Sequence, residues 1–396
     1  MGTDRQEGRQ RNEIKPTGIN RQVMTSAVDR APARSTRMQN GNRFKLGLFG
    51  MNCSGSVPTA APERWRAGWP ETREAARLAD EAGLEFLLPI ARWLGYGGVT
   101  DRQGTSFETL SWASALLAAT KEIVTFATVH VPLLSPVFAA KSCVTADHVG
   151  RGRFGLNVVS GWNVEEFAMF GTQLLDHDDR YRYTEEWVSI VKKVWSETTP
   201  FDFSRKYFDL KHVGGKPKPW GNSRPLLMSA GSSPEGRVFA ARHADCLFMV
   251  IGDEAGLAGE IATLRAGTSG IGVFASGHLM CRATPKETRE YYHYVVHENG
   301  DWEAAEAVIR KRIAGDGRSL PQERLRAMME RFISGGGTFP VIGSYDEVAT
   351  TFKRLADAGL DGMAIATVNY VQEMPIIRDE VLPRLERLGL RQPLHS

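Results

Sequence analysis

The chain has 396 residues, of which 42% are hydrophobic and 24% charged, and its formal net charge is +3. This composition is typical of a globular protein and is too weakly basic to favour a nucleic-acid partner. No run of 18 uncharged apolar residues occurs, which argues against a membrane span. The four cysteines (Cys53, Cys143, Cys246 and Cys281) lie far apart without a CxxC pair, so we expect buried thiols in a reducing cytoplasm and no metal site.

Residues 1–43 differ in composition from the rest of the chain. They hold nine Lys or Arg against four Asp or Glu and show little apolar periodicity. They also lack the apolar stretch of a secretory signal, and their acidic residues count against a mitochondrial presequence. We therefore predict a disordered basic extension, followed by one domain over residues 44–396.

From Phe44 onward, short apolar runs alternate with amphipathic segments. The sequence predicts eight strands, at residues 45–49, 84–88, 123–128, 154–159, 226–230, 245–250, 272–280 and 362–367. Helical patterns lie between them, among others at residues 72–83, 107–120, 136–149, 184–195 and 346–359. This alternation implies parallel strands joined by right-handed crossovers, and eight such units favour a closed (β/α)8 TIM barrel. A doubly wound sheet is the alternative, but no GxGxxG follows the first strand.

The connections between these elements differ in length at the two ends of the predicted barrel. Helices at residues 72–83 and 346–359 end in Ala-Gly and pass directly into strands, as short connections at the barrel bottom do. The connections after strands are longer, and that end of a barrel carries the active site. Residues 283–340 form a polar excursion after the seventh strand, with 334-SGGGTF near its end, and we interpret them as an insertion or lid.

Two motifs indicate a site for an anionic group. In 228-MSAGSSPEG a strand ends in Gly-Ser-Ser and Pro234 opens a helix, whose free N–H groups suit a phosphate; capping by Ser232 or Ser233 is the simpler alternative. In 176-DHDDRYRYTEEW the acids suit the start of a helix better than a metal site. Arg180 and Tyr181 in that stretch offer a guanidinium fork and a hydroxyl.

Other candidates follow the second, third and fourth strands. Arg92 lies in 91-ARWLGYGG, where glycines allow close backbone approach. Thr128 and His130 end the third strand, and His130 is either a proton donor or an inward-facing imidazole. The fourth strand leads through Asn157 into 160-SGWNVEEF. No GxSxG or HExxH motif is present, so this mouth suits a cofactor that carries its own reactivity.

The order of these motifs resembles that of the bacterial luciferase-like, FMN-dependent monooxygenases, from about Phe44 to the C-terminus. The stretches that carry the resemblance are 149-VGRGRFGLNVVSGW, 176-DHDDRYRYTEEW, 216-KPKPW and 228-MSAGSSPEG. The pyrimidine oxygenase and dimethylsulfone monooxygenase branches look closest. By matching motifs, the resemblance implies cofactor contacts at Ala91, Arg92, Asn157, Glu166, Arg180, Tyr181 and Ser233.

The same resemblance implies a reaction. A separate NAD(P)H:flavin reductase would supply reduced FMN, and oxygen would be activated between Thr128 and Asn157 to oxygenate a small organic substrate or cleave its C–N, C–S or C–halogen bond. Trp162 and His130 would line the substrate pocket. A homodimer or homotetramer is expected. The alternative is a deazaflavin- or FMN-dependent dehydrogenase on the same barrel, which would need no oxygen; a barrel that has lost activity is a further alternative.

Overall fold

The eight predicted strands form a closed parallel barrel. The computed structural model describes residues 36–231, 233–268, 270–314 and 321–394. Around the barrel the strands run β1–β2–β3–β4–β7–β8–β9–β11, and β11 returns to pair with β1. They span β1 Lys45–Phe49, β2 Phe86–Leu88, β3 Val124–His130, β4 Phe154–Val159, β7 Leu226–Ala230, β8 Cys246–Met249, β9 Gly272–Arg282 and β11 Gly362–Ala366. The prediction of a (β/α)8 barrel is confirmed.

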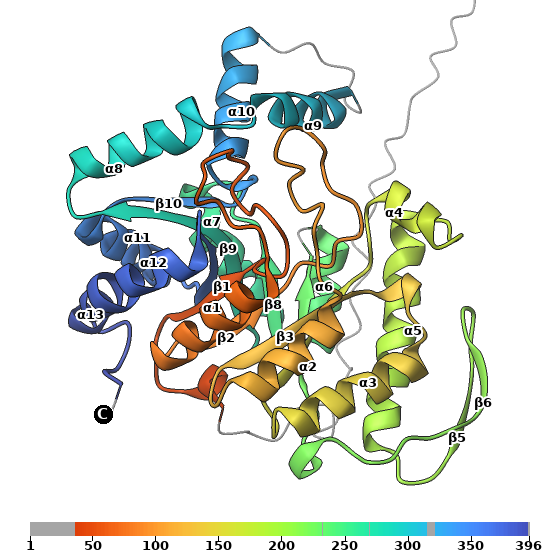
Figure 1. Ribbon diagram of the computed structural model, residues 1–396. Helices are drawn as coiled ribbons and strands as arrows, with labels where there is room; N and C mark the ends of the chain where they lie inside the picture. Colours follow the sequence, from red (N-terminus) through yellow and green to blue (C-terminus); the bar gives the residue numbers. More distant parts are fainter. Residues whose placement is uncertain (1–35, 232, 269, 315–320, 395–396) are drawn as a thin grey trace, which may run out of the picture. The chain divides into compact units, whose positions relative to one another are not determined.

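Helices surround the barrel and alternate with its strands (Figure 1). They are α1 Trp69–Glu81, α2 Thr109–Ala119, α3 Pro136–Val149, α4 Val164–Met169, α5 His177–Ser196, α6 Pro234–His243, α7 Glu254–Gly267, α11 Tyr345–Asp357, α12 Tyr370–Ile376 and α13 Leu382–Arg387. Gly83 and Gly359 follow the C-terminal ends of α1 and α11 and have positive φ, as expected for helices that end in Ala-Gly. A hairpin of β5 Phe201–Ser204 and β6 Asp209–Val213, which the sequence did not suggest, follows α5.

The barrel interior is packed with aromatic side chains. Phe86 lies edge-on to Phe126 and to Phe274, with ring centroids 6.2 Å and 5.5 Å apart. Two inward-facing glycines make room for these rings, because a Cβ at Gly47 would come within 2.6 Å of the Phe86 ring and one at Gly155 within 2.4 Å of the Phe126 ring. The interior side chains that border the barrel mouth therefore lie in the layer above, at the carboxyl ends of the strands.

The lower end of the barrel is closed by residues 36–43 and the C-terminal segment. Met38 is buried in the same cluster as the barrel phenylalanines. Glu85, which is fully buried, accepts hydrogen bonds from Asn42 Nδ2 (2.6 Å), the Leu46 N–H (2.8 Å) and Arg391 Nη1 (2.6 Å). Residues 36–43 thus pack against the barrel, whereas residues 1–35, the rest of the predicted extension, lie outside the described part of the chain.

We expect Glu85→Ala to lower the free energy of unfolding by about 3–5 kcal/mol, because it leaves the buried Arg391 guanidinium without its carboxylate. Urea-induced unfolding measures this loss. Glu81→Ala is the matched control, since Glu81 pairs with Arg77 on the exposed face of α1 and should change stability little. Equal effects of the two substitutions would contradict the role given to Glu85.

Helices cover the carboxyl end of the barrel after β9. They are α8 Pro285–Tyr292, a π-helical turn at His293–Glu298, α9 Trp302–Ala314 and α10 Gln322–Gly335, and β10 Phe339–Ser344 then pairs with β9 (Figure 1). At the end of α10 the backbone packs so closely that a Cβ at Gly335 would lie 1.9 Å from His278 Nδ1 of β9. The predicted excursion is thus helical, although its last residues begin an additional strand beside the barrel.

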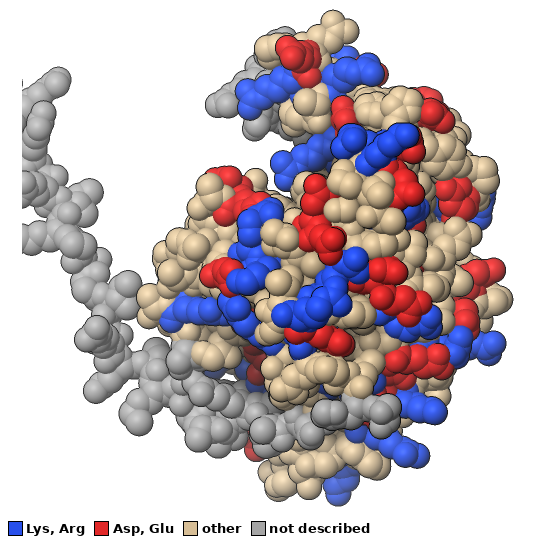
Figure 2. Space-filling model, turned by 90° about the vertical axis from the view of Figure 1, so that its left-hand side faces the viewer, with Lys and Arg blue, Asp and Glu red and all other residues tan. Residues whose placement is uncertain are grey.

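All four cysteines are free thiols and buried, as expected. On the face in Figure 2, Lys and Arg side chains lie interspersed with Asp and Glu, and no single sign dominates. No helix in the described ranges has both the length and the apolar character needed to cross a membrane.

Candidate active site

Thr128 and Asn157 lie side by side above the aromatic layer. The register pairs Thr128 of β3 with Asn157 of β4, two residues beyond the inward-facing Phe126 and Gly155, so both side chains also point inward. Asn157 Nδ2 donates to Thr128 Oγ1 (3.2 Å), and Thr128 Oγ1 donates to the Pro89 carbonyl (2.6 Å). Asn157 Oδ1 is buried and has no hydrogen-bond partner among the described residues. Asn157 therefore has polar capacity left for a ligand, and Thr128 fixes its orientation.

Arg92 is held rigidly at the mouth by the loop after β2. Its Nε donates to Gln103 Oε1 (3.0 Å), its Nη1 to Glu166 Oε1 (3.2 Å) and its Nη2 to the Tyr96 hydroxyl (3.1 Å). The guanidinium carbon also lies 5.4 Å from the centre of the Trp162 ring. Three of the five N–H groups are occupied by these bonds, which leaves two for other partners.

Glu166, on α4, is fully buried and links α4 to the loop after β2. Its Oε1 accepts from the backbone N–H groups of Trp93 (2.9 Å) and Leu94 (3.1 Å) as well as from Arg92. Its Oε2 has no hydrogen-bond partner among the described residues and lies 3.9 Å from His130 Nδ1. The contacts of Glu166 thus fix the residues that border the mouth.

His130 ends β3 beside this carboxylate. Burial lowers the pKa of His130 to about 4; Glu166 opposes this shift and Arg92 adds to it. The imidazole is therefore neutral near pH 7. Its Nδ1 is buried and has no hydrogen-bond partner in the described part of the chain.

A second group of predicted residues gathers at the N-terminus of α6. Ser233 caps this helix by accepting from the Gly236 N–H (3.1 Å), and Pro234 is its first residue. The Tyr181 hydroxyl lies 3.1 Å from Ser233 Oγ. A Cβ at Gly236 would lie 2.6 Å from that hydroxyl, so the helix start and Tyr181 pack tightly. Ser232, the other predicted cap, lies outside the described residues.

Arg180 connects this group to the rest of the mouth. It lies in the first turn of α5, which begins at His177 with Asp178 and Asp179 in that turn, as the capping interpretation predicted. Its Nη1 donates to the Gly161 carbonyl (2.7 Å), just before Trp162 and α4. Its Nε is buried with no hydrogen-bond partner among the described residues.

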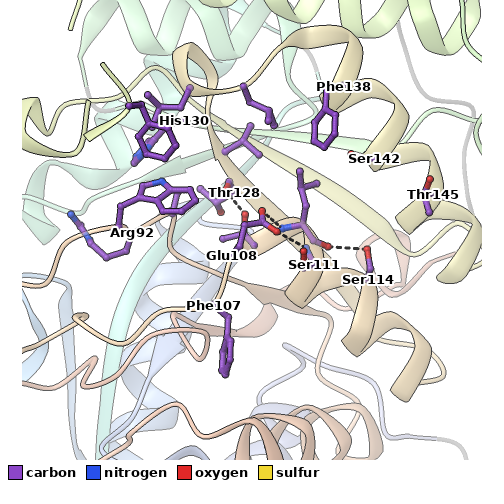
Figure 3. A pocket seen from close by; sticks show the side chains of 18 residues that line it. Arg92, Phe107, Glu108, Ser111, Ser114, Thr128, His130, Phe138, Ser142 and Thr145 are labelled. Carbon is purple, nitrogen blue, oxygen red and sulfur yellow. Dashed lines mark hydrogen bonds between the residues drawn. The ribbon is translucent and has the colours of Figure 1, made fainter. Parts of the chain in front are cut away.

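A cavity of about 510 Å³ opens beside β3. Ala91, Arg92, Thr128 and His130 line its inner end, and it extends between α2 and α3 toward Ser142 and Thr145 (Figure 3). Among the predicted site residues, Asn157, Glu166, Arg180, Tyr181, Ser233 and Trp162 do not line it. Trp162 is 53% exposed on the mouth rim. The predicted residues thus form separate clusters: Thr128 with Asn157, Arg92 with Glu166 and His130, and Tyr181 with Ser233 at α6.

Several residues of the site were not found from the sequence. Gln103 holds Arg92 from a backbone with φ of +62°, and no local pattern indicates this. Glu108 lines the cavity and caps α2 by accepting from the N–H groups of Leu110 and Ser111, both at 2.8 Å. An acidic residue directly before an apolar helical run is a signal that could have identified this cap.

Comparison with known proteins identifies the family. Residues 44–362 match the profile of the luciferase-like monooxygenases, and the chain belongs to this family. The FMNH2-dependent dimethylsulfone monooxygenase of Pseudomonas fluorescens is 28% identical over 361 residues, covering 87% of this chain and 95% of the relative. The pyrimidine monooxygenase RutA of Variovorax paradoxus is 26% identical over 374 residues, covering 91% and 98%. The structure of DmoA from Hyphomicrobium sulfonivorans superposes with a TM-score of 0.79 at 18% identity, covering 89% and 90%.

Proposed function

We propose that the barrel mouth binds FMN and uses it to oxygenate a small organic substrate. The chain is an FMNH2-dependent monooxygenase, and the proposal concerns the residues that bind FMN and the class of substrate. The observation that carries the proposal is the pairing of a Ser-capped helix start, whose dipole suits an anion, with a buried Asn157 whose Oδ1 has no partner among the described residues, in a luciferase-like barrel. The relatives named above support a reaction at a C–S or C–N bond.

The residues at the helix start fit the phosphate of FMN. The hydroxyls of Ser233 and Tyr181 lie side by side at the start of α6 and can donate hydrogen bonds, and the helix dipole favours an anion there. Arg180 adds a positive charge near Gly161. Asn157, Ala91 and Arg92 would border the flavin ring. Glu166 would act on the ring through the backbone of Trp93 and Leu94, which it fixes.

When bound, reduced FMN would supply the electrons that activate oxygen, and the residues of the mouth would position it and keep its surroundings dry. Asn157 Oδ1, which has no partner in the described part of the chain, and the second N–H of the same amide would orient polar atoms above the aromatic layer, and Thr128 holds the amide in place. Water must be kept out, because activated oxygen would otherwise be lost as hydrogen peroxide. The helices α8 to α10 and Trp162 would act as the lid.

The partners follow from this chemistry. An NAD(P)H:flavin reductase would supply reduced FMN, and a cytoplasmic location would provide the reducing conditions that suit four free thiols. We expect a homodimer or homotetramer, because Phe138, Trp93 and Phe170, which line the cavity, are exposed large apolar side chains. Light scattering coupled to size exclusion tests this, and a monomer at micromolar concentration would contradict it.

Substrate-dependent oxygen consumption tests the function. The purified protein, mixed with FMN, NADH and a flavin reductase, should consume oxygen to form an oxygenated product from at least one compound in a panel of sulfones, pyrimidines and haloaromatics. The deazaflavin alternative predicts instead a hydride transfer that proceeds equally well without oxygen. Turnover that is unaffected by removing oxygen would overturn the proposal.

A further inference from the structure

The buried Glu166–His130 pair has two polar atoms left without hydrogen bonds. Glu166 Oε2 and His130 Nδ1 face each other at 3.9 Å, and neither has a hydrogen-bond partner among the described residues. A lone pair on Nδ1 would repel the carboxylate oxygen, whereas a proton on Nδ1 is attracted to it. The neighbouring carboxylate therefore favours the tautomer that carries its proton on Nδ1.

The other ring nitrogen of His130, Nε2, is then available to a molecule in the cavity. His130 lines the inner end of the cavity beside Thr128 (Figure 3). Nε2 makes no hydrogen bond to any described residue, and unlike Nδ1 it is not among the buried unpartnered atoms. With the proton held on Nδ1, Nε2 is a neutral hydrogen-bond acceptor that is accessible from the cavity.

Arg92 lines the cavity, and Glu166 already neutralises the positive charge of its guanidinium. Arg92 Nη1 bonds to Glu166, which belongs to this same cluster, and no second cation is found among the described residues that line the cavity. The remaining charged residue there, Glu108, is an anion that caps α2. An anionic substrate would thus find no unpaired positive charge, and it would face the carboxylate of Glu108.

We infer that Glu166 is a positioning residue that fixes the Nδ1–H tautomer of His130, so that Nε2 accepts a hydrogen bond from a neutral substrate carrying an N–H or O–H donor. This inference rests on the proposed function, because it takes the molecule in the cavity to be the substrate of the monooxygenase. It assigns the cavity to neutral amide-like or imide-like molecules and not to carboxylates or sulfonates. Its first test requires neither turnover nor a known substrate.

The tautomer can be read directly by nitrogen NMR of protein labelled with 15N-histidine and loaded with oxidised FMN. The His130 signals are assigned by their loss in His130→Gln. The wild-type spectrum should show Nδ1 protonated and Nε2 unprotonated at pH 7.5. A protonated Nε2, with or without a proton on Nδ1, overturns the inference.

Glu166→Gln should reverse the tautomer. The glutamine carbonyl would accept from the backbone at Trp93 and Leu94, and its NH2 would then donate to Nδ1, which moves the ring proton to Nε2. Glu165→Gln, on the exposed side of the same helix, is the matched control and should leave the wild-type tautomer. If Glu166→Gln folds and keeps the Nδ1–H form, Glu166 does not position the ring. If it does not fold, the wild-type spectrum still decides the tautomer.

The substrate class is tested with three probes added to the same sample. Uracil, which carries N–H donors, should shift the Nε2 signal and bind at least about tenfold more tightly than 1,3-dimethyluracil, which has none; a lost hydrogen bond to a buried acceptor is of this size. Methanesulfonate should not bind. Equal binding of the two uracils, or tighter binding of the sulfonate, overturns the assignment, while loss of turnover alone would bear only on the proposed function.

Discussion

Asn157→Ala is expected to lower turnover by about 10²–10³-fold while FMN still binds, because removing one positioned polar group from a preorganised site typically costs this much. Asn157 Oδ1 is a buried acceptor without a hydrogen-bond partner among the described residues, and it lies directly beside Thr128. Oxygen consumption coupled to product formation measures the loss, and FMN fluorescence quenching measures binding.

A comparison with Thr128→Val separates the two residues. Thr128 uses its hydroxyl to donate to the Pro89 carbonyl and to accept from Asn157. The valine variant keeps the shape of the side chain but releases the amide of Asn157, so its turnover should fall less than that of Asn157→Ala. Unchanged turnover in Asn157→Ala would refute the role of Asn157.

Ser233→Asp should weaken FMN binding at least about tenfold. Two like charges about 4 Å apart repel by about 1 kcal/mol in water and by about 4 kcal/mol at an effective dielectric constant of 20. The substitution is conservative for the fold, because Asp caps a helix as well as Ser does and α6 would keep its cap. Isothermal titration with FMN gives the dissociation constant.

Ser233→Asn is the matched control for this experiment. Asparagine also caps helices but brings no charge, so its FMN affinity should stay close to the wild-type value. Equal dissociation constants for the Asp and Asn variants would show that the phosphate does not lie at the start of α6.

The sequence predicted the barrel because its strands are short, nearly continuous apolar runs, which buried parallel strands require. The hairpin β5–β6 was missed because 201-FDFS and 209-DLKHV are short and largely exposed, so they have no core-forming pattern. Met38 was missed for a different reason. It is the one buried apolar side chain of residues 36–43, and one apolar residue has no periodicity to recognise.

The sequence predicted individual residues of the candidate site, but it did not predict the contacts between them. Ser233, Pro234 and Tyr181 could be proposed because a helix start has a local signature. Glu166 contacts Arg92 and the backbone of Trp93 and Leu94. These residues are separated from Glu166 by 72 to 74 positions in the sequence. No local rule connects such segments, and only the folded barrel brings the ends of β2, β3 and β4 together.

The most direct test of the central claim is the fate of molecular oxygen. The protein, with FMN, NADH and a flavin reductase, is incubated under 18O2 with dimethylsulfone and with uracil in separate reactions, and the products are analysed by mass spectrometry. We predict that at least one product carries oxygen derived from 18O2 and that Asn157→Ala lowers the yield of this labelled product by about 10²–10³-fold. Product formed without label, or oxygen recovered only as hydrogen peroxide with both compounds and with the wider substrate panel, would contradict the account.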